Sequence, residues 1–255
     1  MSKILIVSEI EVSQLGANIT IHIAFMLQKM GYRVLIIDAN QQHRYLADYL
    51  HNRKSNIRRN DVNILDSNED IIIDADEMLL TEAGLEEKFE QLKKSFHVII
   101  IYNTAYQCKM RKLFYSFADD VHSLIKSNQI EALGFNKDEK LLPGFLSEFM
   151  WQQKKIKAAK SNSAFNWFVA LHDYSDAAIY SKHKLKNMSK KFGFKILPGF
   201  TDHCNQSECF QSGLTVFDLP NVQLSLERSL SLIIAKQEFR RFFQAYRNFS
   251  VLNST

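Results

Sequence analysis

Residues that interrupt, cross-link or loosen a chain are scarce in this sequence. Of its 255 residues, eight are glycine, three are proline and three are cysteine. So little glycine and proline argues against long disordered linkers. The cysteines, Cys108, Cys204 and Cys209, have no CxxC spacing, which argues against a disulfide framework or a zinc site. We therefore expect buried or free thiols in a reducing cytoplasm.

Long apolar runs and a strong excess of charge are missing as well. No run approaches the roughly 20 apolar residues that a membrane helix needs, so we expect no membrane insertion. The chain enters a strand-like run at Lys3 without a charged region and a cleavage site before it, so we expect no signal peptide. The histidines show no HExxH or HxH spacing, and no metal site is predicted. The net charge of +4 permits contact with nucleic acid without requiring it.

Short apolar runs that alternate with helical patterns make up most of the chain. The runs typical of strands buried on both faces are Ile4–Val7, Val34–Ile37, Val98–Ile101, Trp167–Leu171 and, more weakly, Phe194–Leu197. The segments with helical spacing are Ile19–Met30, Leu85–Lys94, Met110–Phe117, Lys182–Phe192 and Leu226–Tyr246. The polar segments 53–70 and 127–140 are expected to be loops or insertions within one domain. The alternation predicts one α/β domain over residues 1–255, with a doubly wound, mostly parallel sheet, helices on both faces and a C-terminal helix at about 226–246.

The stretch SEIEVSQLGAN, residues 8–18, lies between the first predicted strand and the first predicted helix. In a doubly wound sheet this is where a phosphate-binding loop belongs, because the amino end of the helix presents free N–H groups there. Yet the stretch has one glycine, Gly16, and no lysine, and it carries two glutamates, Glu9 and Glu11. Its position predicts a phosphate site, and its composition argues against one.

Motifs spread over the whole chain carry a family resemblance. The segment MGYRVLIIDAN contains a predicted strand and is similar to a family strand that ends in Asp-x-Asp. The segment FHVIIIYNTAY stands where the family has a buried strand that ends in Asp-Thr-Pro-Gly. Further matches are FADDVHSLI, FLSEFMWQQKKIKA, FNWFVALHDYSD, KKFGFKILPGF, CFQSGLTVFDL and LSLERSLSLIIAKQEFRRFFQAY. Together they resemble the ParA/MinD superfamily of deviant P-loop ATPases, and most closely its MipZ branch, which positions the division plane. The resemblance implies a P-loop NTPase fold, with ATP and Mg²⁺ as cofactors.

The departures from the family pattern fall on its nucleotide site. The family loop Lys-Gly-Gly-x-Gly-Lys-Thr-Thr aligns with residues 11–18. Glu11 takes the place of the lysine that bridges a dimer, Ser13 that of a loop glycine, Gly16 that of the phosphate-binding lysine, Ala17 that of the magnesium-ligating hydroxyl, and Asn18 that of the next hydroxyl. A shift of one residue puts Ala17 on the phosphate-binding lysine, so neither register supplies a cation. Asp38 keeps the first acid of Asp-x-Asp, whereas Asn40 replaces the second, and Tyr102 replaces the acid of Asp-Thr-Pro-Gly.

These departures predict a pseudo-ATPase on a MipZ-like scaffold, and we assign no cofactor. A carboxylate about 5 Å from a phosphate is repelled by a few kcal/mol at an intermediate effective dielectric constant. Glu11 in place of the bridging lysine also disfavours the family's nucleotide-sandwich homodimer. An active ATPase with a rearranged phosphate site is the alternative, with Lys3 and Lys109 as candidate cations. A scaffold subunit of another assembly that kept only the fold is a third interpretation.

The resemblance further implies a role in division positioning or chromosome partitioning, in the cytoplasm or at the nucleoid. The expected partners are nonspecific DNA, a ParB-like protein and an intact paralogue. The candidate DNA-binding residues are Lys182, Lys186 and Lys190, which share one helix face, the pair Arg240 and Arg241, and a run of Lys154, Lys155, Lys157 and Lys160. Their contacts with phosphates would be salt-sensitive and sequence-independent. Solvated helix faces are the alternative explanation for each cluster.

Overall fold

A computed structural model describes most of the chain. The described residues are 2–11, 13–39, 43, 45–59, 72–74, 82–104, 109–138, 140–172, 178–201, 209–219 and 226–249. The predicted site position Asn40, together with Cys108 and Cys204, lies outside them. Lys109 and Lys182 belong to described helices, but the structure describes only their backbone.

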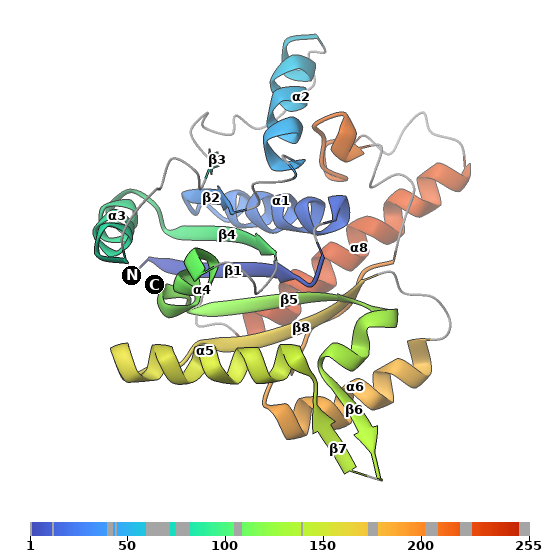
Figure 1. The fold of residues 1–255 in the computed structure, drawn as a ribbon. Coiled ribbons are helices and arrows are strands. Elements are labelled where there is room, and N and C mark those ends of the chain that lie inside the picture. The colour runs from blue at the N-terminus through green and yellow to red at the C-terminus, as the bar shows by residue number, and fades with distance from the viewer. Residues whose placement is uncertain are drawn as a thin grey trace.

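One parallel sheet forms the centre of the molecule (Figure 1). Its strands are β1 (Lys3–Glu9), β2 (Val34–Asp38), β3 (Ile72–Asp74), β4 (Val98–Thr104), β5 (Asp120–Lys126), β8 (Asn166–His172) and β9 (Lys195–Ile196). They follow the order β3-β2-β4-β1-β5-β8-β9, and every pair is parallel. This confirms the predicted doubly wound parallel sheet.

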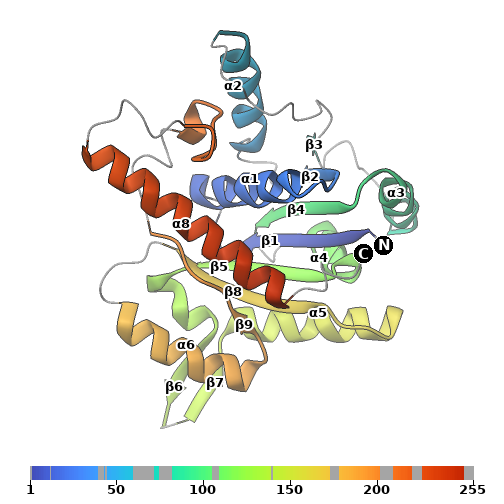
Figure 2. The ribbon, with the colours of Figure 1, turned by 180° about the vertical axis from the view of Figure 1, so that it is seen from behind.

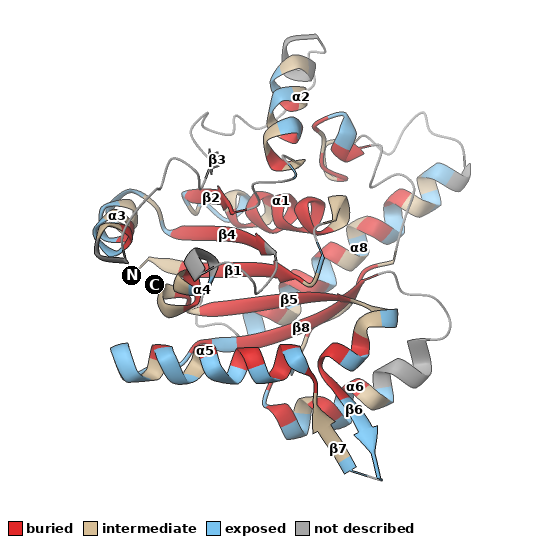
Figure 3. Cartoon of the chain, viewed as in Figure 1, coloured by how far each residue is buried: buried red, intermediate tan, exposed pale blue. Residues whose placement is uncertain are grey.

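Helices cover both faces of the sheet. They are α1 (Gln14–Lys29), α2 (Tyr45–Arg59), α3 (Glu82–Ser95), α4 (Lys109–Phe117), α5 (Phe145–Ser161), α6 (Ala178–Phe192) and α8 (Leu226–Phe249). Strand residues alternate between the two faces: Ile4 and Ile6 pack with α3, α4, α5 and α6, and Leu5 and Val7 pack with α1, α2 and α8. Figures 1 and 2 show α8 behind and then in front of the sheet. Strands β1, β2, β4, β5 and β8 are largely buried between the two layers, as their red colour in Figure 3 shows.

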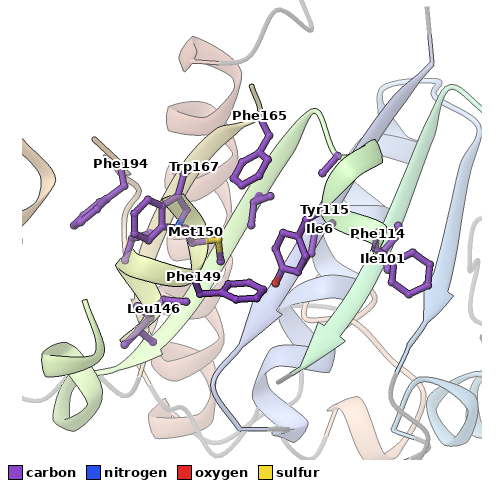
Figure 4. Packing of buried hydrophobic residues seen from close by; sticks show 14 of the residues in the cluster. Ile6, Ile101, Phe114, Tyr115, Leu146, Phe149, Met150, Phe165, Trp167 and Phe194 are labelled. Carbon is purple, nitrogen blue, oxygen red and sulfur yellow. The ribbon is translucent and has the colours of Figure 1, made fainter. Parts of the chain in front are cut away.

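The layer formed with α4 and α5 is a continuous aromatic and aliphatic core (Figure 4). Trp167 is 1% exposed and packs against Phe194, with ring centroids 5.0 Å apart. Its indole N–H donates to Ser123 Oγ at 3.0 Å, so the polar atom of this large buried ring is satisfied. Tyr115 packs edge-on against Phe149 at 5.2 Å. This core fixes β5 and β8, whose carboxyl ends flank the candidate site.

The opposite layer holds α8 against α1 and the sheet. The His22 ring of α1 stacks on Phe239 of α8 at 4.0 Å, and its Nε2 accepts the Val216 N–H at 3.0 Å. Further along α8, the Tyr246 hydroxyl donates to Asp120 Oδ2 at 2.7 Å, at the start of β5. The predicted C-terminal helix is therefore tied both to α1 and to the sheet.

Two segments predicted to be loops contain regular structure. Residues 53–59 belong to α2, where the buried Arg53 guanidinium donates to Asp218 Oδ2 at 2.9 Å. Residues 127–140 contain a 3₁₀ helix, η2 (Ser127–Ala132), and an antiparallel hairpin of β6 (Gly134–Lys137) and β7 (Lys140–Pro143) that projects from the sheet in Figure 1. Because most of β6 is exposed, its sequence lacks the apolar alternation that identifies a strand.

Candidate functional site

The predicted phosphate-loop position lies at the carboxyl edge of the sheet, where β1 leads into α1 (Figure 1). Ligands of doubly wound proteins bind at this edge. Ser13 caps α1: its backbone is extended, and its Oγ accepts the Gly16 N–H at 3.0 Å. The helix therefore begins at Gln14, five residues before the apolar pattern from which it was predicted. The positive end of the α1 dipole lies at this amino end, next to the end of β1.

The carboxylate of this chain's own Glu9 occupies the space in front of α1. The Glu9 side chain is buried, with the whole residue 2% exposed. Its Oε1 accepts the Ser13 hydroxyl at 2.6 Å, and its Oε2 lies 3.3 Å from the Ser13 N–H and 2.6 Å from the Tyr102 hydroxyl. An acidic group thus lies where a phosphate-binding loop presents its donors to a phosphate.

Gly16 makes room for this carboxylate. A Cβ on residue 16 would lie 1.9 Å from Glu9 Oε2 and 2.0 Å from Glu9 Cδ, far inside van der Waals contact. No other residue fits there while the glutamate keeps its place. A lysine at this position and the buried Glu9 carboxylate therefore exclude each other.

The hydrogen bonds around Glu9 fit a protonated carboxyl group. The Tyr102 hydroxyl has one proton but two acceptors, Glu9 Oε2 at 2.6 Å and the Ser13 carbonyl at 2.9 Å. If Glu9 carries a proton, it can donate to the tyrosine oxygen while the tyrosine donates to the carbonyl. Burial raises the pKa of Glu9 to about 7, although the hydrogen bonds from Ser13 and Tyr102 act in the opposite direction. Burial, with Glu9 beside it, raises the pKa of Tyr102 well above its ordinary range.

A histidine that the sequence did not single out also reaches this group. His172, at the end of β8, is 2% exposed, and its Nε2 lies 3.6 Å from Glu9 Oε1. Lys126, at the end of β5, lowers the pKa of Glu9 through its charge, the weakest of the influences on this group. The signal for both residues was their position, since parallel strands bring their carboxyl ends to the same edge.

The other positions assigned by resemblance are less closely grouped. Glu11 is exposed on the loop, whereas Ala17 and Asn18 are buried in the first turns of α1. Asp38 ends β2 in register with Tyr102 on β4, and it contributes to the raised pKa of that tyrosine. Thus the structure brings Ser13, Gly16 and Tyr102 together around Glu9, places Asp38 beside them and leaves Glu11 in solvent.

Lys3 cannot supply a rearranged phosphate site with charge. It starts β1, so it lies at the amino edge of the sheet, and its Nζ is 3.4 Å from Asp120 Oδ2. A seven-residue strand separates it from Glu9 by roughly 20 Å. Lys109 begins α4, and its side chain is outside the description.

The candidate DNA-binding residues lie on separate surfaces. Lys186 and Lys190 lie on α6, and Arg240 and Arg241 are exposed on α8, which covers the opposite face of the sheet. Lys157 does not belong to a basic surface. It is 5% exposed, donates to the Ala118 carbonyl and lies 3.8 Å from Asp119. Because two positions along a helix point in different directions, Lys157 faces inward while Lys155 is exposed.

A basic groove accompanies the α8 arginines. It has a volume of about 430 Å³ and is lined by Met26, Arg240, Phe243, Gln244, Arg247 and Asn248. Burial lowers the pKa of the nearby Lys236, and the charges of Arg240 and Lys29 lower it further. Lys236 and Arg240 of α8 and Lys29 at the end of α1 thus lie close enough for their charges to act on Lys236.

Two further observations concern metals and membranes. In the part of the chain that the structure describes, no cluster of three or more histidine, cysteine, aspartate or glutamate side chains could hold a metal ion. None of the described helices combines the length and the apolar character needed to cross a membrane.

The family model described as ATPase MipZ matches residues 6–248. The chain belongs to the MipZ family. This match confirms the family resemblance predicted from the sequence. Residues 8–18 alone would not have shown it. No curated protein sequence compared with the chain matches it significantly.

Several solved structures have the same fold as this chain. A variant of McdA from Cyanothece in complex with ATP superimposes with a TM-score of 0.62 at 14% identity, over 96% of each chain. A protein described as a putative plasmid partition protein of Borrelia burgdorferi, bound to AMPPNP, gives 0.61 at 12% identity, over 98% of this chain and 100% of that one. A chain of the MinC:MinD cell division protein complex of Aquifex aeolicus gives 0.58 at 13% identity, over 95% and 96%. At these identities the likeness establishes the fold alone.

Proposed function

We propose that this MipZ-family protein acts in positioning cell division or in chromosome partitioning as a binding module that does not use an ATP switch. Membership of the family supports the cellular role. The proposed partners are DNA and a ParB-like protein. The Glu9 carboxylate at the amino end of α1 carries the claim that ATP is not used.

The residues around α1 do not fit a magnesium-bound nucleotide. A phosphate placed before the helix would meet the buried Glu9 carboxyl group, and where Glu9 is ionised their repulsion at about 5 Å is a few kcal/mol. Gly16 and Ala17 supply neither the lysine nor the hydroxyl of the family loop. Tyr102, in the position of a metal-site acid, donates its hydrogen bond to Glu9 or to the Ser13 carbonyl. Glu9, Gly16, Ala17 and Tyr102 thus all argue against a bound magnesium nucleotide.

The α8 surface is the better candidate for DNA. Arg240, Arg241, Arg247 and Lys236 lie on one helix, with Lys29 of α1 nearby. After Glu238, the described part of α8 has no acidic residue, so the side chains of this stretch carry a net positive charge. Such a surface would bind phosphates without reading sequence. A nucleotide-sandwich homodimer stays disfavoured because Glu11 is exposed where the family has its bridging lysine.

The test is duplex binding with and without nucleotide. Fluorescence anisotropy would measure the affinity of the full chain for an arbitrary labelled duplex at low salt, in buffer alone and with millimolar ATP and Mg²⁺. We expect the same affinity in both conditions and no phosphate release above background. An ATP-dependent gain of tenfold or more would contradict the proposal, whereas no binding in either condition would leave the scaffold interpretation.

A further inference from the structure

We propose that Glu9 is an internal ligand: its carboxylate occupies an oxyanion site at the amino end of α1, and shortening this side chain opens the site to phosphate-type anions. This inference rests on the proposed function, in which the wild-type chain holds no nucleotide there. It adds that the binding geometry persists and is filled from within.

The first argument is the convergence of donors on the carboxylate. The Ser13 hydroxyl, the Ser13 N–H and the Tyr102 hydroxyl lie within 2.6 to 3.3 Å of its two oxygens. They come from the cap of α1 and from β4, and they lie in front of a 16-residue helix whose positive end attracts anions. These groups suit any oxyanion, and the carboxylate is the one that the chain itself supplies.

The second argument is the space. The Glu9 carboxylate lies directly against the Cα of Gly16, in the volume that a side chain on residue 16 would fill. In a Glu9→Ala variant, this volume is bordered by Gly16 and by the donors of Ser13 and Tyr102. Donors buried without a partner are costly, so an anion that reaches them restores their hydrogen bonds.

The third argument is the charge that remains. His172 Nε2 lies 3.6 Å from Glu9 Oε1, and Lys126 acts on Glu9 electrostatically. Lys126 keeps its charge when the glutamate is shortened, so the loss of the Glu9 carboxylate leaves the site more positive. The competing explanation is that Glu9 only holds the loop together, in which case its removal weakens the fold and creates no affinity.

The test compares three variants of the full chain, titrated calorimetrically with inorganic pyrophosphate at pH 8. Glu9→Ala is expected to bind at least tenfold more tightly than the wild type. Glu9→Gln, which fills the same volume, is expected to gain much less. Glu11→Ala is the matched control. It removes an equal charge only two residues along the chain, but from a side chain that is exposed. If Glu9→Ala does not fold, Glu9→Ser takes its place.

A gain confined to the shortened Glu9 variants supports the inference. A folded Glu9→Ala variant without a gain, or an equal gain in Glu11→Ala, overturns it. Magnesium–ATP binding by the wild type would instead overturn the proposed function, so the two failures are distinguishable.

Discussion

The buried Glu9 side chain requires glycine at position 16: a Cβ on residue 16 would lie 1.9 Å from Glu9 Oε2. The absence of a lysine at position 16 and the inward position of Glu9 are therefore structurally linked. The carboxylate satisfies donors at the start of α1, and the glycine leaves the volume that the carboxylate needs.

A double-mutant cycle tests this relationship. Gly16→Ala alone is expected to lower the free energy of unfolding by about 1–3 kcal/mol, the usual cost of overpacking, because the new methyl group displaces Glu9. In a Glu9→Ala background the same change should be neutral, or stabilising by up to about 1 kcal/mol, since alanine is the better helix former. Urea unfolding of the four proteins gives the coupling energy. Additive effects within about 0.5 kcal/mol would show that the two residues are independent.

Glu9 also predicts a specific dependence of stability on pH. Its pKa is about 7 in the folded protein against 4.5 in an unfolded chain, so folding favours the protonated form. As the pH rises from 4.5 to 7, the free energy of unfolding of the wild type should fall by up to about 3 kcal/mol. Above pH 7 this contribution should stay constant. Glu9→Gln keeps the shape without titrating. The variant should therefore gain stability over the wild type across this window.

The measurement is urea unfolding of wild type and Glu9→Gln at several pH values from 4.5 to 8. Taking the difference between the proteins cancels the titration of every other group. A difference that does not change with pH would contradict the buried, proton-holding carboxyl group.

The sequence predicted the sheet because buried parallel strands have continuous apolar runs, as Val98–Ile101 does. It also predicted that the loop lacks a cation. It could not predict that Glu9 turns inward, because that depends on Tyr102 and His172, which reach the site from strands far along the chain. The β6–β7 hairpin and α2 escaped prediction because exposed or mixed faces leave no clear period. Lys157 was misplaced because a run of lysines does not show which one the helix turns inward.

His122 should set part of the acid limit of stability. Its ring is buried among Phe168, Phe242 and Tyr246, and neither nitrogen has a hydrogen-bond partner among the described residues. Burial lowers its pKa from 6.5 to about 4, so the unfolded chain takes up a proton first as the pH falls. As the pH falls from 6.5 to 4, this difference in proton uptake should lower the free energy of unfolding by up to about 3 kcal/mol.

His122→Phe removes that cost and keeps the aromatic packing. Thermal unfolding at pH 7 and pH 4.5 should show the variant gaining on the wild type at the lower pH. His22, whose pKa is also lowered to about 4 by burial, titrates in both proteins and cancels. An equal difference at the two pH values would mean that folding does not lower the pKa of His122.

The two basic helices can be separated by charge reversal. Arg240→Glu together with Arg241→Glu on α8 should weaken duplex binding at least tenfold. It should also reduce the slope of log affinity against log salt by about one for each phosphate that the helix no longer binds. Lys186→Glu with Lys190→Glu on α6 is the matched control, since it reverses the same amount of charge on the other face and should change binding little. The opposite ranking of the two variants would assign DNA binding to α6.

The most direct test of the central claim is calorimetric titration of the wild-type chain with ATP and Mg²⁺ at pH 8, where Glu9 is largely ionised. No detectable heat at millimolar nucleotide is the predicted result, because the chain's own carboxylate holds the place of the phosphate. Binding in the micromolar range would mean that Glu9 leaves its position in solution and that the nucleotide switch of the family is retained.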